Sequence, residues 1–326
     1  MDRMSIVSIR KCGRGVLPFL GAIAVLLLLA ACAPSPLISP TGSTGACGAP
    51  ALAVAAAHGL TRLAFCDDFD SVATIDARAS GEPGFNWYPQ NFWGVPTTRS
   101  SDYRVESSVL SLLDQSLPSG TGLQTAGPLT YSPPRYVGRV FAAPFYVQIR
   151  FAVSKAAAPG SPGLAGCGAG SAVARYSWPT LWMQDVDLLF HQTSRTDPAR
   201  SEAEIDGIEF YVGCDGQGRG NWKIQMNVHE WSGHRIIGAD AVNTPDLGAY
   251  GFDEGTFHTI AWLVETAHAG GGRGSVTWYF DGIQVAQATW LPGAPLSSVE
   301  RAAFDLIMNP GFRTWPIFID YVEVWQ

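Results

Sequence analysis

Charged side chains are scarce in this 326-residue chain, at 15% of the residues against about 25% in a typical soluble domain. Basic residues are the scarcer sign, 21 against 28 acidic, and the formal net charge is −7. An acidic chain is unsuited to nucleic acid and other polyanions, so we expect no nucleic-acid partner. Glycine (36 residues) and aromatic residues (11%) are plentiful, which is typical of β proteins whose turns are polar but uncharged.

The N-terminal region has no apolar run long enough to cross a bilayer as a helix. The run from Val16 to Ala31 falls short of the roughly 20 residues required, follows a basic segment and ends in small residues, as a cleaved secretory signal does. Leu29-Ala30-Ala31-Cys32 resembles a bacterial lipobox. This resemblance implies lipidation of Cys32, which would anchor the exported chain to a membrane of the cell envelope. An ordinary signal followed by an unmodified cysteine is the alternative.

The sequence therefore divides into a lipoprotein signal peptide (1–31), a tether (32–60) and a globular domain (61–326). The tether is rich in Ala, Pro, Ser and Gly and has almost no charge and no sustained periodicity, so we expect it to form no core. The remaining chain is long enough for one large all-β domain, and no second linker interrupts it. We expect this domain to act as a monomer.

Spacings typical of a structural zinc site are missing, because no CxxC or HxxxH pair occurs. Once the signal's cysteine and Cys32 are set aside, an even number of cysteines remains, which fits disulfides in an exported protein. These are Cys47, Cys66, Cys167 and Cys214. Three pairings are open, and we favour Cys47 with Cys66 and Cys167 with Cys214, because each pair closes a short loop or flanks an acidic segment near position 206.

Alternating apolar and polar residues predict strand after strand. Residues 146–153 place Val147, Ile149, Phe151 and Val153 on one face. Further strands are predicted at 258–265, 275–280, 283–288, 304–309 and 316–325, with Asp281-Gly282 as a hairpin turn. No stretch is convincingly helical. The pattern predicts an all-β fold, an antiparallel β-sandwich in which one curved sheet leaves a concave cleft for a polymer.

One predicted strand carries three carboxylates, in the stretch Glu204-Ile205-Asp206-Gly207-Ile208-Glu209. In a regular strand, Glu204 and Asp206 share one face and Glu209 points away from them. A bulge at Gly207 would re-aim the following residues and bring Glu209 back to the other two acids. Two glutamates beside a short aspartate could then reach the separation of roughly 5–5.5 Å between carboxyl groups that retaining glycosidases use.

Two structural interpretations compete with a site. A helix starting at Asp197-Pro198 would carry the acids in its first turns, although the β-favouring run 208–212 argues against it. A solvated strand face is the other interpretation, since Glu202, Glu204 and Asp206 fall on one parity and charges usually face water.

Tryptophans flank the acidic stretch on both sides. Trp178 and Trp182 precede it, and Trp231 follows it together with His229. Because the apolar face of a sugar ring packs on an aromatic face, we predict that the three tryptophans line the cleft. Each tryptophan taken alone could equally belong to the core, and His229 could be structural rather than a contact of the acids.

With these residues in view, the chain resembles glycoside hydrolase family 16, the laminarinase, lichenase and agarase group of concanavalin A-like jelly rolls. The active-site strand of that family reads E-[IL]-D-x-x-E, which positions 204–209 match. A W-P-x-x-W segment at 178–182 precedes it, and a strand bearing His229 follows it. The hairpin at 278–282 and the closing strand at 319–324 also match, so the resemblance covers about Phe65 to Gln326.

The resemblance implies that Glu204 is the nucleophile, that Glu209 is the acid/base, and that Asp206 lies between them and hydrogen-bonds Glu204. Carboxyl groups that share a face raise one another's pKa, so one glutamate can stay protonated near neutral pH. No cofactor is implied. The resemblance does imply a structural calcium ion, held by Asp320 in the last strand and by an early acid, either Asp67 or Asp68.

The segment between positions 182 and 204 is long and carries Asp185 and Asp187, and residues 156–170 form a Gly/Ala/Pro-rich insertion. Both suggest an elaborated cleft rim and leave the sugar open. We predict an endo-acting, retaining glycoside hydrolase of a β-linked polysaccharide, either a β-glucan or a related galactan. A non-catalytic, lectin-like envelope lipoprotein on the same fold is the main alternative, and a structural lipoprotein is a third. The three acids favour the enzyme, because a protein that only binds glycans has no need to keep them together.

Overall fold

The computed structural model describes residue 47 and the ranges 53–90, 95–98, 100–113, 121–128, 136–153, 179–187, 202–210, 224–232, 235–253, 255–267, 272–293, 296–309 and 316–326. The chain divides into two compact units, Met1–Ser39 and Pro40–Gln326, and every described residue lies in the second. The predicted lipidation site Cys32, the tryptophan Trp178, and Cys167 and Cys214 therefore lie outside the described residues, as do the insertion and most of the predicted rim.

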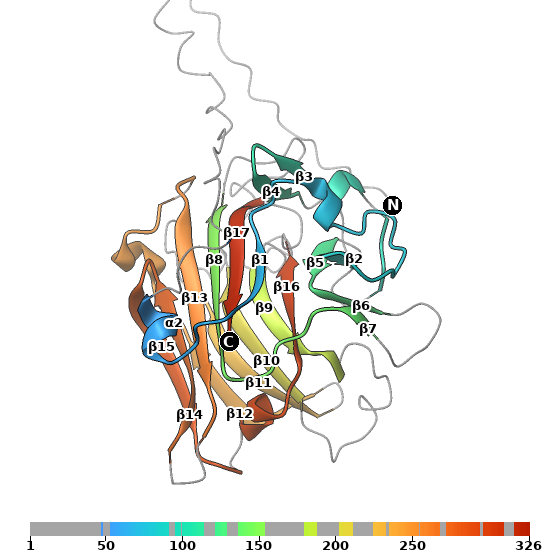
Figure 1. Ribbon diagram of the computed structural model, residues 1–326. Helices are drawn as coiled ribbons and strands as arrows, with labels where there is room; N and C mark the ends of the chain where they lie inside the picture. Colours follow the sequence, from blue (N-terminus) through green and yellow to red (C-terminus); the bar gives the residue numbers. More distant parts are fainter. Residues whose placement is uncertain are drawn as a thin grey trace, which may run out of the picture. The chain divides into compact units, whose positions relative to one another are not determined.

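One sheet has eight strands, in the ladder order β15-β14-β13-β8-β17-β4-β3, with β1 paired to β17. The strands are β1 (Leu63–Asp67), β3 (Tyr103–Glu106), β4 (Val109–Leu112), β8 (Phe145–Val153), β13 (His258–Glu265), β14 (Gly274–Phe280), β15 (Ile283–Trp290) and β17 (Ile317–Trp325). Their pairings are antiparallel. Figure 1 shows β8 and β17 side by side within this layer, although they lie far apart in the sequence.

The other large sheet has seven strands, in the order β12-β11-β10-β9-β16-β5-β2, and its pairings are also antiparallel. These strands are β2 (Tyr88–Gln90), β5 (Gly122–Gln124), β9 (Thr180–Asp185), β10 (Glu202–Glu209), β11 (Met226–Ser232), β12 (Arg235–Asn243) and β16 (Phe304–Asn309). A small sheet pairs β6 (Ala126–Pro128) with β7 (Tyr136–Gly138). The acidic stretch is strand β10, so the helical interpretation is wrong.

The core lies between the two large sheets. The alternating residues of β8 that face it, Val147, Ile149, Phe151 and Val153, are all buried, as predicted. They belong to one hydrophobic cluster with Leu181, Met183, Ile205 and Ile208 of the seven-stranded sheet. Fully burying each large apolar side chain contributes about 1.5–3 kcal/mol. The predicted all-β, antiparallel sandwich is confirmed, and its arrangement is that of a jelly roll.

The predicted hairpin between β14 and β15 is confirmed in detail. Asp281 and Gly282 both have positive φ, +46° and +78°. Two positive φ angles at the central residues define the tight turn that matches the twist of antiparallel strands. The turn extends the eight-stranded sheet to its β15 edge.

Helical structure in the described ranges is limited to short segments. They include α2 (Ala53–Ala57), the 3-10 turns η2 (Val72–Thr74), η3 (Ser100–Asp102), η7 (Leu247–Tyr250) and η8 (Ser297–Glu300), and the helical residues Val186 and Asp187. None of the described helices has the length and apolar character that a bilayer span requires. Figure 1 shows that the strands dominate the fold.

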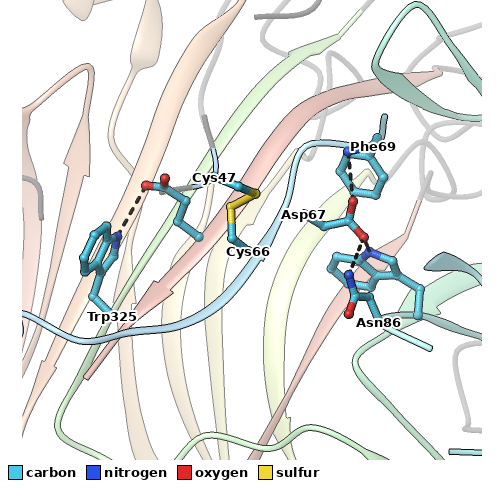
Figure 2. The surroundings of a disulfide bond; sticks show 8 residues. Cys47, Cys66, Asp67, Phe69, Asn86 and Trp325 are labelled. Carbon is cyan, nitrogen blue, oxygen red and sulfur yellow. Dashed lines mark hydrogen bonds between the residues drawn. A yellow bond between two sulfur atoms is a disulfide. The ribbon is translucent and has the colours of Figure 1, made fainter. Parts of the chain in front are cut away.

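The end of the predicted tether differs from expectation, because it packs against the domain. Ala55 of α2 and Leu60 are buried in a cluster with Tyr146, Leu263 and Trp325 of the eight-stranded sheet. An alanine-rich run forms a helix readily and lets a backbone approach a sheet closely. A disulfide between Cys47 and Cys66, the pairing we favoured, ties the same segment to β1 (Figure 2).

Candidate active site

A bulge in β10 brings the three acids to one face. Against β9, Glu204 lies opposite Gln184 and Asp206 opposite Trp182, then the register shifts by one residue and Glu209 lies opposite Thr180. These three partners are every second residue of β9, so they share a face of the sheet, and the three acids opposite them share it too. Ile205 and Ile208 point into the core instead. The bulge predicted at Gly207 is therefore confirmed, and the acids lie on the face of the seven-stranded sheet that is turned away from the core.

Asn227 of β11 connects two of the acids. Its side-chain amide nitrogen donates to Oε2 of Glu209 at 2.6 Å and to Oδ2 of Asp206 at 3.0 Å. Asn227 is fully buried, and Asp206 and Glu209 are 2% and 6% exposed. A buried amide that donates to two carboxyl groups fixes their separation, because both hydrogen bonds are strong in a site from which water is excluded.

His229 and Trp231 lie on the same face of β11, beside the other acid. Nε2 of His229 lies 3.2 Å from Oδ2 of Asp206 and 4.0 Å from Oε1 of Glu204. The indole nitrogen of Trp231 donates to Oε2 of Glu204 at 3.1 Å, and its ring meets the His229 ring edge-on at 6.4 Å. The side chains of Glu204 and His229 are each 12% exposed, so the site is open to a ligand at Glu204.

Sequence reasoning missed the role of Asn227, although a signal for it was present. Asn227, His229 and Trp231 are alternate residues of one strand and therefore share a face. Once His229 and Trp231 were placed beside the acids, the alternation alone would have added Asn227. The structure thus joins six side chains at this site, from the two neighbouring strands β10 and β11.

Trp182 lies on the predicted face but is not an open stacking surface. It is 3% exposed and packs with Ala126, Val186 and Ile307, and its indole nitrogen donates to Oδ1 of Asn309 at 2.9 Å. Alternation predicts the face of a residue, but it does not show that the β6 segment covers that part of the sheet. Of the tryptophans predicted to bind sugar, Trp231 is half-buried and donates to Glu204, Trp182 lies opposite Asp206 but is buried, and Trp178 lies outside the described residues.

The groups at Asp320 do not fit a calcium site. Asp320 is fully buried and forms an ion pair with Arg150, whose guanidinium also lies 4.8 Å from the centre of the Phe257 ring. The early acid Asp67 is also occupied, since its carboxylate accepts hydrogen bonds from the backbone of Phe69 and from the side chains of Asn86 and Trp87 (Figure 2). A cation and N–H donors surround these carboxylates, whereas Ca²⁺ requires oxygen ligands.

A different set of ligands has the composition of a metal site. Nε2 of His229 and carboxylate oxygens of Glu204 and Asp206 lie within 4.8 Å of one another. Imidazole and carboxylate groups suit zinc and related ions. The same three groups are also those that a glycosidase would use for its own chemistry, so we do not assign the set to a metal.

Two further acids near the site are buried and were not assigned a role. Asp305 lies on β16 opposite Gln184, and burial raises its pKa well above the usual range, although Thr125 and the backbone of Ala126 donate to it. Asp185 at the end of β9 is 8% exposed, and burial raises its pKa to about 7, opposed by a hydrogen bond from the Asp187 backbone. Asp185 belongs to the segment that we predicted to elaborate the cleft rim, and it is the last residue of β9.

No family model matches the chain, and no curated protein is significantly similar to it in sequence. Solved structures do resemble it. A laminarinase from Flavobacterium sp. UMI-01 is 16% identical with a TM-score of 0.48, and the match covers 81% of this chain and 100% of the laminarinase. An endo-1,3-beta-glucanase from Streptomyces sioyaensis is 15% identical with a TM-score of 0.48, over 81% and 95% of the two chains. A glycoside hydrolase family 16 endo-glucanase from Bacteroides ovatus is 12% identical with a TM-score of 0.49, over 80% and 99%. The chemistry proposed for this chain therefore rests on its own side chains.

Proposed function

We propose that this protein is an endo-acting glycoside hydrolase that cleaves a β-linked polysaccharide, a β-glucan or a related galactan, with retention of configuration. The observation that carries the proposal is the bulge in β10, which places Glu204, Asp206 and Glu209 on one face. A strand that only faced water would need neither the bulge nor the buried amide of Asn227 between two carboxyl groups. Retaining hydrolysis needs two carboxyl groups at a fixed short separation.

The contacts of the glutamates support the assignment of their roles. The Trp231 indole donates to Glu204, and an N–H donor stabilises the ionised carboxylate that a nucleophile must be. Glu209 is more deeply buried and is held by Asn227. Oδ2 of Asp206 accepts a hydrogen bond from Asn227 and lies 3.2 Å from Nε2 of His229. Asp206 therefore shares Asn227 with Glu209 and His229 with Glu204, which couples the two glutamates.

The reaction has two steps. The Glu204 carboxylate attacks the anomeric carbon and forms an ester bond to the sugar, while the glycosidic C–O bond breaks and the Glu209 proton passes to the leaving oxygen. Glu209 then takes a proton from a water molecule, whose oxygen bonds to the anomeric carbon as the ester bond to Glu204 breaks. Both carboxyl groups return to their starting states, and the configuration is inverted twice.

The substrate class follows from the surroundings of Glu204. Trp231 is half-buried beside this acid, and a ring in that position can carry the apolar face of a pyranose next to the nucleophile. We propose that the outer face of the seven-stranded sheet forms the cleft in which the polysaccharide lies. We further propose that the protein is an exported monomer, anchored in the cell envelope through a lipid on Cys32.

A panel assay tests the activity. A soluble form beginning after Cys32, which keeps the Cys47–Cys66 disulfide, is offered laminarin, mixed-linkage glucan, xyloglucan, agarose and carrageenan, and reducing ends are measured. We expect one or more of them to be cleaved, and Glu204→Gln to lower kcat by about 10³-fold or more. Glu230→Gln is the matched control, because Glu230 is a buried glutamate of β11 on the opposite parity.

Two results would contradict the proposal. Binding of a glycan by the wild type and by Glu204→Gln, with reducing ends from none of the five, would identify a lectin. Inverted anomeric configuration of the first-formed product, followed by proton NMR, would exclude the glycosyl-enzyme intermediate on Glu204.

A further inference from the structure

The bulge in β10 leaves a backbone carbonyl that the strand ladder does not satisfy in the regular way. A bulge inserts one residue into a strand and disrupts the pairing around it. The carbonyl oxygen of Asp206, next to the inserted Gly207, accepts a hydrogen bond of 2.9 Å from the indole nitrogen of Trp278. This bond is buried, and a buried carbonyl without a partner would be costly. Trp278 therefore satisfies a group that exists because of the bulge.

A second tryptophan occupies the space that a side chain at Gly207 would need. A Cβ atom built on Gly207 would lie 2.3 Å from the nearest carbon of the Trp262 ring. Since real Cβ atoms do not approach ring carbons so closely, the Trp262 ring packs directly on the bulged backbone and only glycine fits beneath it.

Both tryptophans come from the eight-stranded sheet, across the core from the acids. Trp262 of β13 and Trp278 of β14 are directly opposite each other, and both are fully buried. The indole nitrogen of Trp262 lies 3.3 Å from Sδ of Met183, a residue of β9, the strand against which the bulge is formed. The pair thus contacts both strands that form the register shift, β10 at Asp206 and Gly207 and β9 at Met183.

We propose that Trp278, supported by Trp262, is a positioning residue that sets the separation of Glu204 and Glu209 from the opposite sheet. The inference rests on the proposed function, because it assigns the pair a role in retaining catalysis. Neither tryptophan touches substrate. Without the bond from Trp278, the Asp206 carbonyl must find another partner, and the backbone between Asp206 and Glu209 shifts. Glu209, which lies beyond the bulge, moves relative to Glu204, which lies before it.

Trp278→Phe tests the proposal, since it removes the N–H donor and keeps an aromatic ring. The matched control is Trp290→Phe, because Trp290 is also buried on the eight-stranded sheet and donates its indole N–H to Glu300 rather than to the backbone of β10. On laminarin we expect Trp278→Phe to lower kcat by about 10- to 100-fold with KM within about twofold, as misplacement of a catalytic group by a fraction of an ångström does. Trp290→Phe should lower thermal stability to a similar extent and keep kcat within about twofold.

Azide separates a displaced Glu209 from a general loss of structure. With a 2,4-dinitrophenyl β-1,3-glucoside, the leaving group needs no proton, and turnover depends on attack by water on the glycosyl-enzyme, which Glu209 assists as base. Azide attacks the anomeric carbon without such assistance, forms a C–N bond and releases the Glu204 carboxylate. We expect azide to accelerate Trp278→Phe several-fold and to yield the β-glycosyl azide, and to have no effect on Trp290→Phe or on the wild type. Equal kinetics of the two variants, without azide acceleration, would overturn the proposal.

A structural measurement keeps the test independent of activity. In crystal structures, we expect the distance between the carboxyl carbons of Glu204 and Glu209 to change in Trp278→Phe and to stay within error in Trp290→Phe. An unchanged distance would refute positioning by Trp278 even if no substrate were found. A wild type that is inactive on every probe would instead refute the proposed function. If Trp278→Phe does not fold, 3-benzothienylalanine at position 278 keeps the shape of the indole and lacks only its N–H.

Discussion

The side-chain amide nitrogen of Asn227 lies 2.6 Å from Oε2 of Glu209, across the pairing of β11 with β10. The same nitrogen donates to Asp206 at 3.0 Å, so one amide group touches two acids of the site. A donor placed between carboxyl groups lowers their mutual repulsion and holds them in register. Asn227 thus contacts acids of this site as closely as do His229 and Trp231, which the sequence predicted to lie beside the acids.

Asn227→Ala should impair catalysis more than folding. Loss of the donor leaves Glu209 and Asp206 without their common partner, and we expect kcat on the best polysaccharide of the panel to fall by about 10- to 100-fold. Asn243→Ala is the control, because Asn243 on the neighbouring strand β12 donates its amide to the backbone of Met226, at 3.3 Å, rather than to a carboxyl group. An Asn227→Ala enzyme with wild-type kcat would show that the bridge has no catalytic role.

Asp185→Asn should stabilise the protein by an amount that grows as the pH rises from about 4 to 7. Burial raises the Asp185 pKa to about 7 in the folded state, against about 3.9 in an unfolded chain. Between these values the folded state holds a proton that the unfolded state has released, so the free energy of unfolding falls as pH rises from about 4 to 7. Asparagine stays neutral and still accepts the hydrogen bond from the Asp187 backbone.

Urea unfolding at pH 4, 6 and 8 measures this effect. We expect Asp185→Asn to raise the free energy of unfolding by about 2–4 kcal/mol at pH 8 and by close to zero at pH 4. Asp246→Asn serves as the control, since Asp246 caps the turn η7 and asparagine caps equally well. A gain that is the same at all three pH values would mean that a proton on Asp185 is not the cause.

Local patterns in the sequence predicted the elements of this fold and one irregularity within them. The alternation in residues 146–153 identifies the core face of β8, and Asp281-Gly282 identifies the hairpin. Gly207 among β-favouring residues, with acids at unequal spacing, predicted the bulge before any partner strand was known. These features depend on neighbours in the chain, so the sequence contains them directly.

Relationships across the sheets were beyond such reasoning. Arg150 and Asp320 are 170 positions apart, and their pairing depends on a second register shift in β17, between Ile319 and Tyr321. Trp182 was placed on the right face, but the covering by the β6 segment depends on residues more than 50 positions earlier. The bond from Trp278 to the bulge likewise joins the two sheets. Each requires the three-dimensional packing, which no periodicity encodes.

Cys32→Ala should release the protein from the membrane. If the thiol is lipidated after cleavage, the full chain expressed in a bacterial host fractionates with membranes, and the variant becomes soluble with unchanged activity. Labelling with radioactive palmitate and mass spectrometry of the mature N-terminus provide the measurement. Cys12→Ala is the matched control, because cleavage removes position 12 and should leave labelling intact. A wild-type chain that carries no lipid would exclude the anchor.

Arg150→Met should destabilise the protein, and calcium should not replace the lost cation. Asp320 is fully buried, so removal of Arg150 leaves a buried carboxylate without its counter-charge, at a cost of about 3 kcal/mol. Arg150→Met combined with Asp320→Asn should recover most of that loss, because an amide needs no counter-charge. The Tm of the wild type, measured by calorimetry, should be the same in EDTA and in millimolar Ca²⁺, since a guanidinium group stands beside Asp320 where a metal would need oxygen ligands. A Tm lowered by EDTA would mean that the domain depends on a bound metal. A double variant no more stable than Arg150→Met would mean that Arg150 does not stabilise the fold through its ion pair with Asp320.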